Sequence, residues 1–273
     1  MGAFLRGLRH WLLALQFSTR VPVTGRLAAW VGYSPAMLRA SAAHLPGIGW
    51  VVGGVSAVVL AGTLWAMPAV PASPWVAAVL ATVAGLVLTG AFHEDGLADL
   101  ADGLGGSSQR ERALEIMKDS RLGSFGAIAL FMALLLKCAL LATLAQWDPS
   151  LAVWALFAGH VVSRLFPLWL MHALPYVAAL AGSKSQDMAL PLGWGALGVG
   201  LLWSVASLAL AMAVIPSSSW LMAVLVPVLT CACMQRLLQR RLQGYTGDAL
   251  GATQQLCELA YLLGLAMGLG RGG

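Results

Sequence analysis

Charge is scarce in this chain of 273 residues. Only 10% of the residues are Asp, Glu, Lys or Arg, whereas a soluble domain carries about 25%. So few charges could not cover a globule of this size with polar surface, which excludes a water-soluble enzyme. The 59% share of hydrophobic residues also excludes a disordered chain, because disorder requires low hydrophobicity. The composition predicts a polytopic helical membrane protein.

Cysteine is also scarce, and its pattern carries no chemistry. The chain has 4 cysteines and no C-x-x-C pair. Cys231 and Cys233 would point to opposite sides of a helix. All the cysteines lie in or beside apolar runs, where cysteine packs as a small apolar residue. The pattern excludes a disulfide scaffold and gives no support to a thiolate metal site.

Long apolar stretches are abundant, and each is near the length of roughly 20 residues that crosses a bilayer. They cover residues 45–67, 75–92, 125–145, 151–172, 192–215, 219–235 and 252–270. The last begins with Gln254, Gln255 and Glu258, which leaves open a short or half-buried span. We predict an all-α transmembrane bundle of about seven spans, forming one domain over 1–273.

Lys and Arg fall in alternate connections between these stretches. Connections 68–74, 146–150 and 216–218 contain neither. The positive-inside rule then places segments 1–44 and 93–124 on the cytoplasmic side of the inner membrane. Leucines at helical spacing in 3–17, beside Arg6 and Arg9, predict a helix on the membrane surface or against the bundle. The net charge of +5 therefore indicates cytoplasmic loops, with no nucleic acid as a partner.

Acidic residues are concentrated in one segment. Seven of the 11 lie within 94–119, and no Lys or Arg occurs from Val51 to Ser108. Asp95, Asp99 and Asp102 are spaced i, i+4, i+7, so on a helix they lie within about 60° of one another. The segment directly follows the second apolar stretch, so we expect it to extend that helix out of the membrane.

Aligned carboxylates repel one another, by about 3 kcal/mol for a pair ~6 Å apart at an effective dielectric near 20. A divalent cation would offset this repulsion, and oxygen ligands without cysteine or paired histidine suit Mg²⁺ or Mn²⁺ rather than zinc. We predict Glu94, Asp95, Asp99 and Asp102 as its ligands. The alternatives are protonated carboxylates or a solvated acidic face, with His93 either a further ligand or a residue that ends the membrane part of the helix.

A basic segment follows the acidic one. Lys118, Asp119, Ser120 and Arg121 stand just before a glycine-rich helix start at 123–126. Free N–H groups at a helix start, with cations beside them, bind anions. We therefore predict a phosphate site here, close to a metal on the acidic face. The alternative for Arg121 is the usual enrichment of cations in cytoplasmic loops.

Three further polar residues lie in or near apolar stretches. Arg164 is inside 151–172, where a buried cation should face the bundle interior and meet an anion. It is either a substrate-binding candidate or a residue whose side chain extends to the membrane surface. Lys137 lies inside 125–145, and the sequence does not distinguish a functional from a structural role for it. Asp248 lies between glycines, in a loop that could approach a ligand closely.

These motifs resemble those of the cobalamin synthase family. The resemblance rests on E-D-G-L-A-D with D-G (94–103), M-K-D-S-R-L-G (117–123), and T-G-D with L-G-A (246–252). The weaker run Q-F-S-T-R-V-P-V (16–23) is similar to an N-terminal signature of the family, F-x-T-R-x-P. It contains Arg20, which is therefore a substrate-binding candidate. The resemblance covers nearly the whole chain, with the motifs in the right order.

The resemblance implies a Mg²⁺-dependent integral membrane enzyme that joins adenosylcobinamide-GDP to α-ribazole, or to its 5′-phosphate, and releases GMP. The acidic run also looks distantly like the CDP-alcohol phosphotransferase signature D-G-x-x-A-R, but D-G-L-A-D lacks its arginine. A homo-oligomer is possible. A cation-coupled transporter and another membrane phosphotransferase are the alternatives.

The expected mechanism assigns one role to each candidate residue. The acidic face holds Mg²⁺ against the diphosphate. Lys118, Arg121 and Arg164 hold phosphate oxygens, with Ser120 beside them. Asp119, or a metal-site carboxylate such as Asp99, accepts the proton of the ribazole 3′-hydroxyl. Asp248 closes the site from the last apolar stretch.

Overall fold

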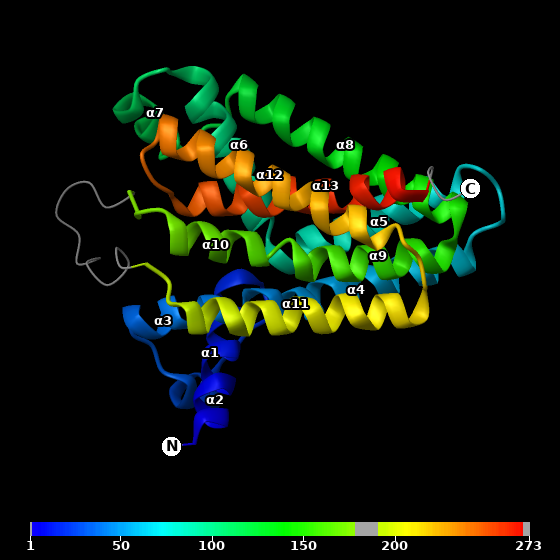
Figure 1. Ribbon diagram of the computed structural model, residues 1–273, viewed down its shortest axis with the longest axis horizontal. Coiled ribbons are helices and arrows are strands. Elements are labelled where there is room, and N and C mark those ends of the chain that lie inside the picture. The colour runs from blue at the N-terminus through cyan, green and yellow to red at the C-terminus, as the bar shows by residue number, and fades with distance from the viewer. Residues whose placement is uncertain (1, 178–190, 270–273) are drawn as a thin grey trace.

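The computed structural model describes residues 2–177 and 191–269, and these residues are almost entirely helical (Figure 1). The long helices are α4 (Leu45–Ala66), α5 (Ser73–Thr89), α6 (Phe92–Gly106), α8 (Ser124–Trp147), α9 (Pro149–Val162), α11 (Trp194–Val214), α12 (Trp220–Arg241) and α13 (Gly247–Leu269). The others are α1 (Ala3–Ser18), α2 (Gly25–Val31), α3 (Pro35–Ser41), α7 (Arg110–Ile116) and α10 (Leu165–Ala173). In the described ranges, β-pairing is limited to an isolated bridge between Tyr176 and Tyr245. The prediction of an all-α bundle is confirmed.

The number of spans differs from the predicted seven. Within residues 2–177 and 191–269, five helical segments are long and apolar enough to cross a membrane: Pro35–Ala66, α8, Pro149–Ala173, α11 and α12. The bent pair of α5 and α6 would make six. The last apolar stretch corresponds to α13, which is not among them; Gln254, Gln255 and Glu258 lower its hydropathy.

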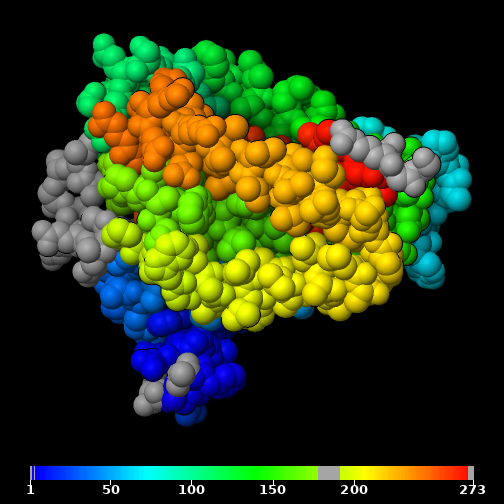
Figure 2. Space-filling view, viewed as in Figure 1, coloured from blue at the N-terminus to red at the C-terminus, as the bar shows by residue number. Residues whose placement is uncertain are grey.

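Helix α13 lies inside the bundle. It packs against α6, α8, α9, α10 and α12, and Figure 2 shows it (red) largely covered by α12 (orange). Small residues permit the closest approach, since a Cβ at Gly264 would come within 2.3 Å of the Met222 carbonyl oxygen. The central helix can therefore carry polar side chains that lipid never meets.

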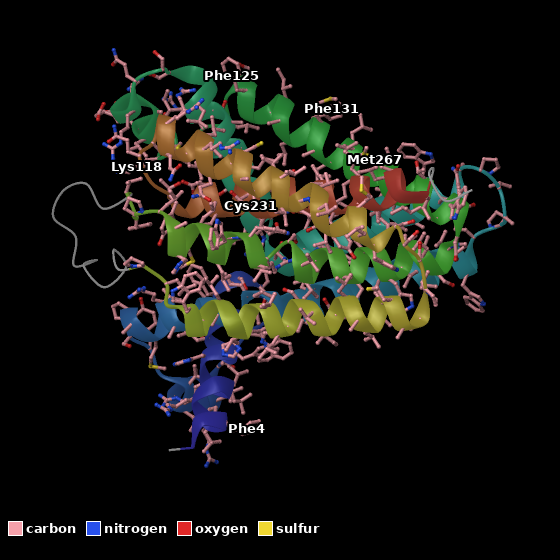
Figure 3. All side chains as sticks on the ribbon, in the orientation of Figure 1. Phe4, Lys118, Phe125, Phe131, Cys231 and Met267 are labelled. Carbon is pink, nitrogen blue, oxygen red and sulfur yellow. The ribbon has the colours of Figure 1, made fainter. Side chains whose placement is uncertain are left out.

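The outer helices present apolar side chains to their surroundings. Ile128 and Phe131 on α8, Leu202 on α11 and Leu229 on α12 are all exposed, and Figure 3 shows Phe125 and Phe131 pointing away from the bundle. An exposed apolar surface this large must be covered by another apolar surface. Lipid tails can cover helices that are long enough to span a bilayer. The chain is therefore a membrane protein.

A sharp bend separates α5 from α6. The two helices meet at 90°, so the expectation that the acidic segment prolongs the second span is wrong. Gly90 and Ala91 both have positive φ, at 67° and 59°, which ends α5. The Arg20 backbone N–H donates to the Leu88 carbonyl oxygen at 2.7 Å, and its side chain lies against Gly90. The bend directs α6 back against α8 and α13.

The N-terminal helices project sideways from the bundle (Figure 1). Helix α1 covers the predicted helix 3–17 and packs through Ala14 and Leu15 against Ile48 and Val52 of α4. Phe4, near its outer end, is exposed (Figure 3). The predicted helix is thus confirmed, whereas its position on a membrane surface stays a prediction.

Candidate active site

Three carboxylates gather where α6 meets the start of α13. Asp95 and Asp99 come from α6 and Asp248 from the first turn of α13. Gly96 allows this approach, because a Cβ there would lie 2.9 Å from the Cα of Asp248. Asp99 is close enough to both other carboxylates for electrostatic repulsion. Among the ion pairs of the described residues, none involves these carboxylates, so no protein cation offsets the repulsion there.

Two cavities border this carboxylate group: Asp248 lines both of them, Asp95 lines one, and Asp99 lines neither. The outer cleft, of about 430 Å³, is lined by Lys118 and by residues of α7. The inner cavity, of about 310 Å³, is lined by Asp95, Arg164 and several aromatic side chains. Both are bounded by Tyr176, Gly247 and Asp248. A ligand in either cavity can therefore reach Asp248.

Asp102 has a structural partner that the sequence did not suggest. Its carboxylate oxygens accept hydrogen bonds from the backbone N–H groups of Gly123, at 2.7 Å, and Gly126, at 2.8 Å. The anion at the start of α8 is thus Asp102 itself, rather than the predicted phosphate. Its role as a metal ligand stays a prediction, but its first contribution is to hold α8 against α6.

Glu94 also lies apart from the other predicted ligands. It is buried and accepts a hydrogen bond from the Gln255 side chain at 2.8 Å. His93, beside it, is buried and lines the inner cavity. Glu94 therefore ties α6 to α13, and its role as a metal ligand stays a prediction.

The basic segment lies in the loop before α8. Lys118, labelled in Figure 3 near the end of the bundle that carries α7, lines the outer cleft. Arg121 is exposed and pairs with Asp119 at 2.5 Å, and this hydrogen-bonded pair lowers the pKa of Asp119 to about 2. Such a carboxylate is a weak general base at neutral pH. Ser120 is exposed, and neither Ser120 nor the Asp119–Arg121 pair lines the two cavities.

Arg20 and Arg164 have different surroundings. Arg20 is at the α5–α6 bend and is not part of the inner-cavity lining. Arg164 is buried, lines the inner cavity, and donates to the His160 carbonyl oxygen at 2.6 Å. Its Nε has no hydrogen-bond partner. The expected anion is not in direct contact, since the ion pairs of the described chain do not include Arg164.

A buried polar network lies below the inner cavity. Lys137 of α8 pairs with Glu258 of α13 at 2.5 Å, and the other carboxylate oxygen of Glu258 lies 3.2 Å from His160 Nδ1. Gln254 donates to Glu258 at 2.7 Å. Gln255 donates to Gln254 at 2.9 Å as well as to Glu94. The network therefore connects the cavity floor to the helix that carries Asp95 and Asp99.

The carboxylate group suits Mg²⁺ through its donor atoms. Within the described residues, no three His, Cys, Asp or Glu side chains form a complete ligand set. Mg²⁺ commonly binds through one or two carboxylates, with water and substrate phosphates completing the octahedron. Asp95, Asp99 and Asp248 supply oxygen donors only, and they have no competing cation. They fit a metal that a phosphate-bearing substrate helps to hold.

Comparison with known proteins decides the family. The model of the family "Cobalamin-5-phosphate synthase" matches residues 10–266. The chain belongs to this family.

Curated relatives of this synthase family member match over nearly full length. An adenosylcobinamide-GDP ribazoletransferase from Albidiferax ferrireducens is 53% identical, covering 96% of this chain and 99% of the relative. The corresponding protein of Polaromonas naphthalenivorans is 52% identical over 97% and 100%. One from Shewanella amazonensis is 40% identical over 98% of each chain. No solved structure matches. Family membership shows an enzyme, which overturns the transporter alternative.

The sequence reasoning missed most of the polar network of this family member. The sequence patterns do not single out His160, and they indicate Gln254, Gln255 and Glu258 only as polar residues at the start of the last apolar stretch. Their signal was present: Gln254 and Glu258 are four residues apart, on one helix face, inside an apolar stretch. Polar residues on one face of such a helix are usually paired within the protein.

Gly96→Ala tests the contact between α6 and α13 in this synthase family member. The added methyl group would meet the Asp248 backbone, with a carbonyl oxygen at 2.8 Å. We expect the added methyl group to displace Asp248 from α6, and therefore from Asp95 and Asp99. We expect kcat to fall by roughly tenfold or more, because small displacements of positioning groups are costly. Steady-state kinetics measures this. Gly54→Ala is the matched control, since a Cβ there meets nothing within 4 Å; an equal loss in both variants would contradict the assignment.

Proposed function

We propose that this chain is an adenosylcobinamide-GDP ribazoletransferase whose reaction takes place at Asp95, Asp99 and Asp248. One observation carries the proposal: Asp95, Asp99 and Asp248 lie together with no ion-pair partner among the described residues, and Asp248 borders two cavities. This arrangement suits two substrates that approach from different sides and react at a phosphate. The names of the relatives state such a reaction.

The proposed reaction transfers a phosphoryl group. The 3′-oxygen of α-ribazole, or of its 5′-phosphate, forms a bond to the phosphorus that carries the cobinamide. The bond from that phosphorus to the bridging oxygen of the diphosphate breaks, and GMP leaves with the electron pair. Asp99 accepts the hydroxyl proton. Asp119 is less suitable, because Arg121 lowers its pKa to about 2.

The remaining residues bind and orient. Lys118 lines the outer cleft, and its ammonium group binds phosphate oxygens of the donor. Asp95 and Asp248 line the inner cavity and, with Asp99, would hold Mg²⁺. When bound, this ion neutralises charge on the diphosphate as GMP leaves. The Asp119–Arg121 pair is an exposed local contact within the loop between the cleft and α8.

We place the site on the cytoplasmic side of the inner membrane. Helix α7 and the α12–α13 turn lie at one end of the bundle, opposite the connection between α4 and α5 (Figure 1). Arg110, Arg112, Arg240 and Arg241 belong to the first end, whereas connection 67–72 contains no Lys or Arg. The positive-inside rule supports the first end as cytoplasmic.

The test uses purified protein in lipid nanodiscs with cobinamide-GDP, ribazole or its 5′-phosphate, and Mg²⁺. We expect GMP and a corrinoid product in a one-to-one ratio. Folded protein that forms neither would contradict the proposal.

Removal of the metal is a separate prediction. Excess EDTA should reduce GMP release to the rate without enzyme, and added Mg²⁺ should restore it, because the carboxylates would otherwise repel both one another and the diphosphate. GMP release followed by chromatography measures this. Undiminished release in EDTA would show that the carboxylates work without a divalent cation.

A further inference from the structure

We propose that the inner cavity is the acceptor subsite, and that Arg164 there binds the 5′-phosphate of a phosphorylated aromatic nucleoside. The inference rests on the proposed function. It adds the assignment of each cavity to one substrate, and it identifies the residue that selects the phosphorylated acceptor.

Arg164 is a buried cation that forms no ion pair with any residue that the structure describes. It is 3% exposed, and among the described residues its hydrogen bonds go only to the carbonyl oxygen and the ring of His160. Its Nε has no partner. Glu258, the buried carboxylate below it, pairs with Lys137 and His160 instead. Burying a charge without a partner is costly, and an anion in the cavity would offset that cost.

The walls of the cavity suit a flat aromatic group. Phe17 and Phe92 meet edge to face, with ring centroids 5.5 Å apart. The ring centroids of Tyr176 and Tyr245 lie 5.4 Å apart, and an isolated β-bridge joins the backbones of these two residues. All four line the cavity. Aromatic rings pack favourably against another ring, so these walls can hold the base of a nucleoside.

Size separates the two substrates. The inner cavity, at about 310 Å³, is at the lower end of the range for small-molecule sites. It can hold a single nucleotide but not a corrinoid that carries a nucleoside diphosphate. The donor therefore approaches through the outer cleft, whose lining includes Lys118.

The cavity also places the acceptor correctly for the reaction. Asp95 and Asp248 line it together with Arg164. A nucleotide with its phosphate at Arg164 and its base between the aromatic rings can turn its ribose hydroxyl groups toward these carboxylates. Asp248 borders the outer cleft as well, so the donor diphosphate can meet the hydroxyl there.

Arg164→Gln provides the test, in steady-state kinetics with each acceptor form. We expect KM for ribazole 5′-phosphate to rise roughly ten- to hundredfold, the effect of losing a charge-assisted hydrogen bond. KM for unphosphorylated ribazole and for cobinamide-GDP should change less than about twofold. Arg240→Gln, which removes an exposed arginine on α12, is the control for charge and should change none of the three constants. Equal changes for both acceptor forms, or no change, would overturn the role of Arg164.

A second variant keeps the proposal testable if Arg164→Gln does not fold. Met171 lines the inner cavity and is only partly buried. Met171→Trp should fill the cavity and raise KM for both acceptor forms at least tenfold, while the binding of cobinamide-GDP, followed by its absorbance, persists. Unchanged acceptor constants would overturn the subsite. Wild-type protein that forms no GMP with either acceptor would instead reject the proposed function.

Discussion

Asp99→Asn is expected to reduce kcat by roughly a thousandfold while the protein remains folded. Asn has the same shape but cannot accept the hydroxyl proton, and proton transfer to a positioned group commonly contributes 10²- to 10⁴-fold. It also binds Mg²⁺ less well, because it carries no charge. Single-turnover measurement of GMP release, at saturating substrates and Mg²⁺, gives the loss directly.

The matched control is Asp148→Asn. Asp148 caps α9, and its side chain accepts a hydrogen bond from the Ser150 backbone N–H at 2.8 Å. Asn caps helices about as well as Asp, so this variant should keep wild-type activity and stability. Retained activity in Asp99→Asn at saturating Mg²⁺ would show that the acidic face is only a surface feature.

Lys137→Met is expected to lower the free energy of unfolding by about 3–5 kcal/mol, the usual cost of leaving a buried charge without its partner. Lys137 and Glu258 are both buried, at 4% and 1% side-chain exposure. The loss appears in denaturant or thermal unfolding in detergent. The double variant Lys137→Met, Glu258→Gln should recover much of it, because the buried carboxylate that has lost its lysine is then neutral.

The control for this prediction is Lys118→Met, which removes an exposed lysine. We expect its unfolding free energy to change by less than about 0.5 kcal/mol, as is usual for surface positions. If Lys137→Met changed the free energy of unfolding as little as Lys118→Met, the ion pair would not stabilise the fold. A double variant that is no more stable than Lys137→Met would lead to the same conclusion.

Composition and periodicity predicted the helices but not how they bend or nest. Apolar stretches predicted the membrane class because apolar content and length alone decide it. The bend at Gly90 depends on contacts with Arg20, from a different part of the chain, which no local pattern contains. The internal position of α13 is equally a property of the packed bundle, where its polar side chains find partners on α6, α8 and α9.

The candidate site was predictable where one segment carries it. Asp95 and Asp99 follow from spacing on a single helix. Asp102 shares that spacing, but its carboxylate binds backbone N–H groups of the next span, a long-range contact that spacing cannot show. Asp248 is distant in sequence, and only the resemblance of its motif, together with the flanking glycines, pointed to it.

The most direct test of the central claim is the binding of Mn²⁺, as a paramagnetic substitute for Mg²⁺, followed by electron paramagnetic resonance in nanodiscs. The claim is that Asp95, Asp99 and Asp248 hold a divalent cation together with the substrate diphosphate. Wild-type protein should bind Mn²⁺ tightly only when cobinamide-GDP is present, and Asp99→Asn should lose that binding. Equal Mn²⁺ binding in the wild type and in Asp99→Asn, with the donor present, would contradict the claim.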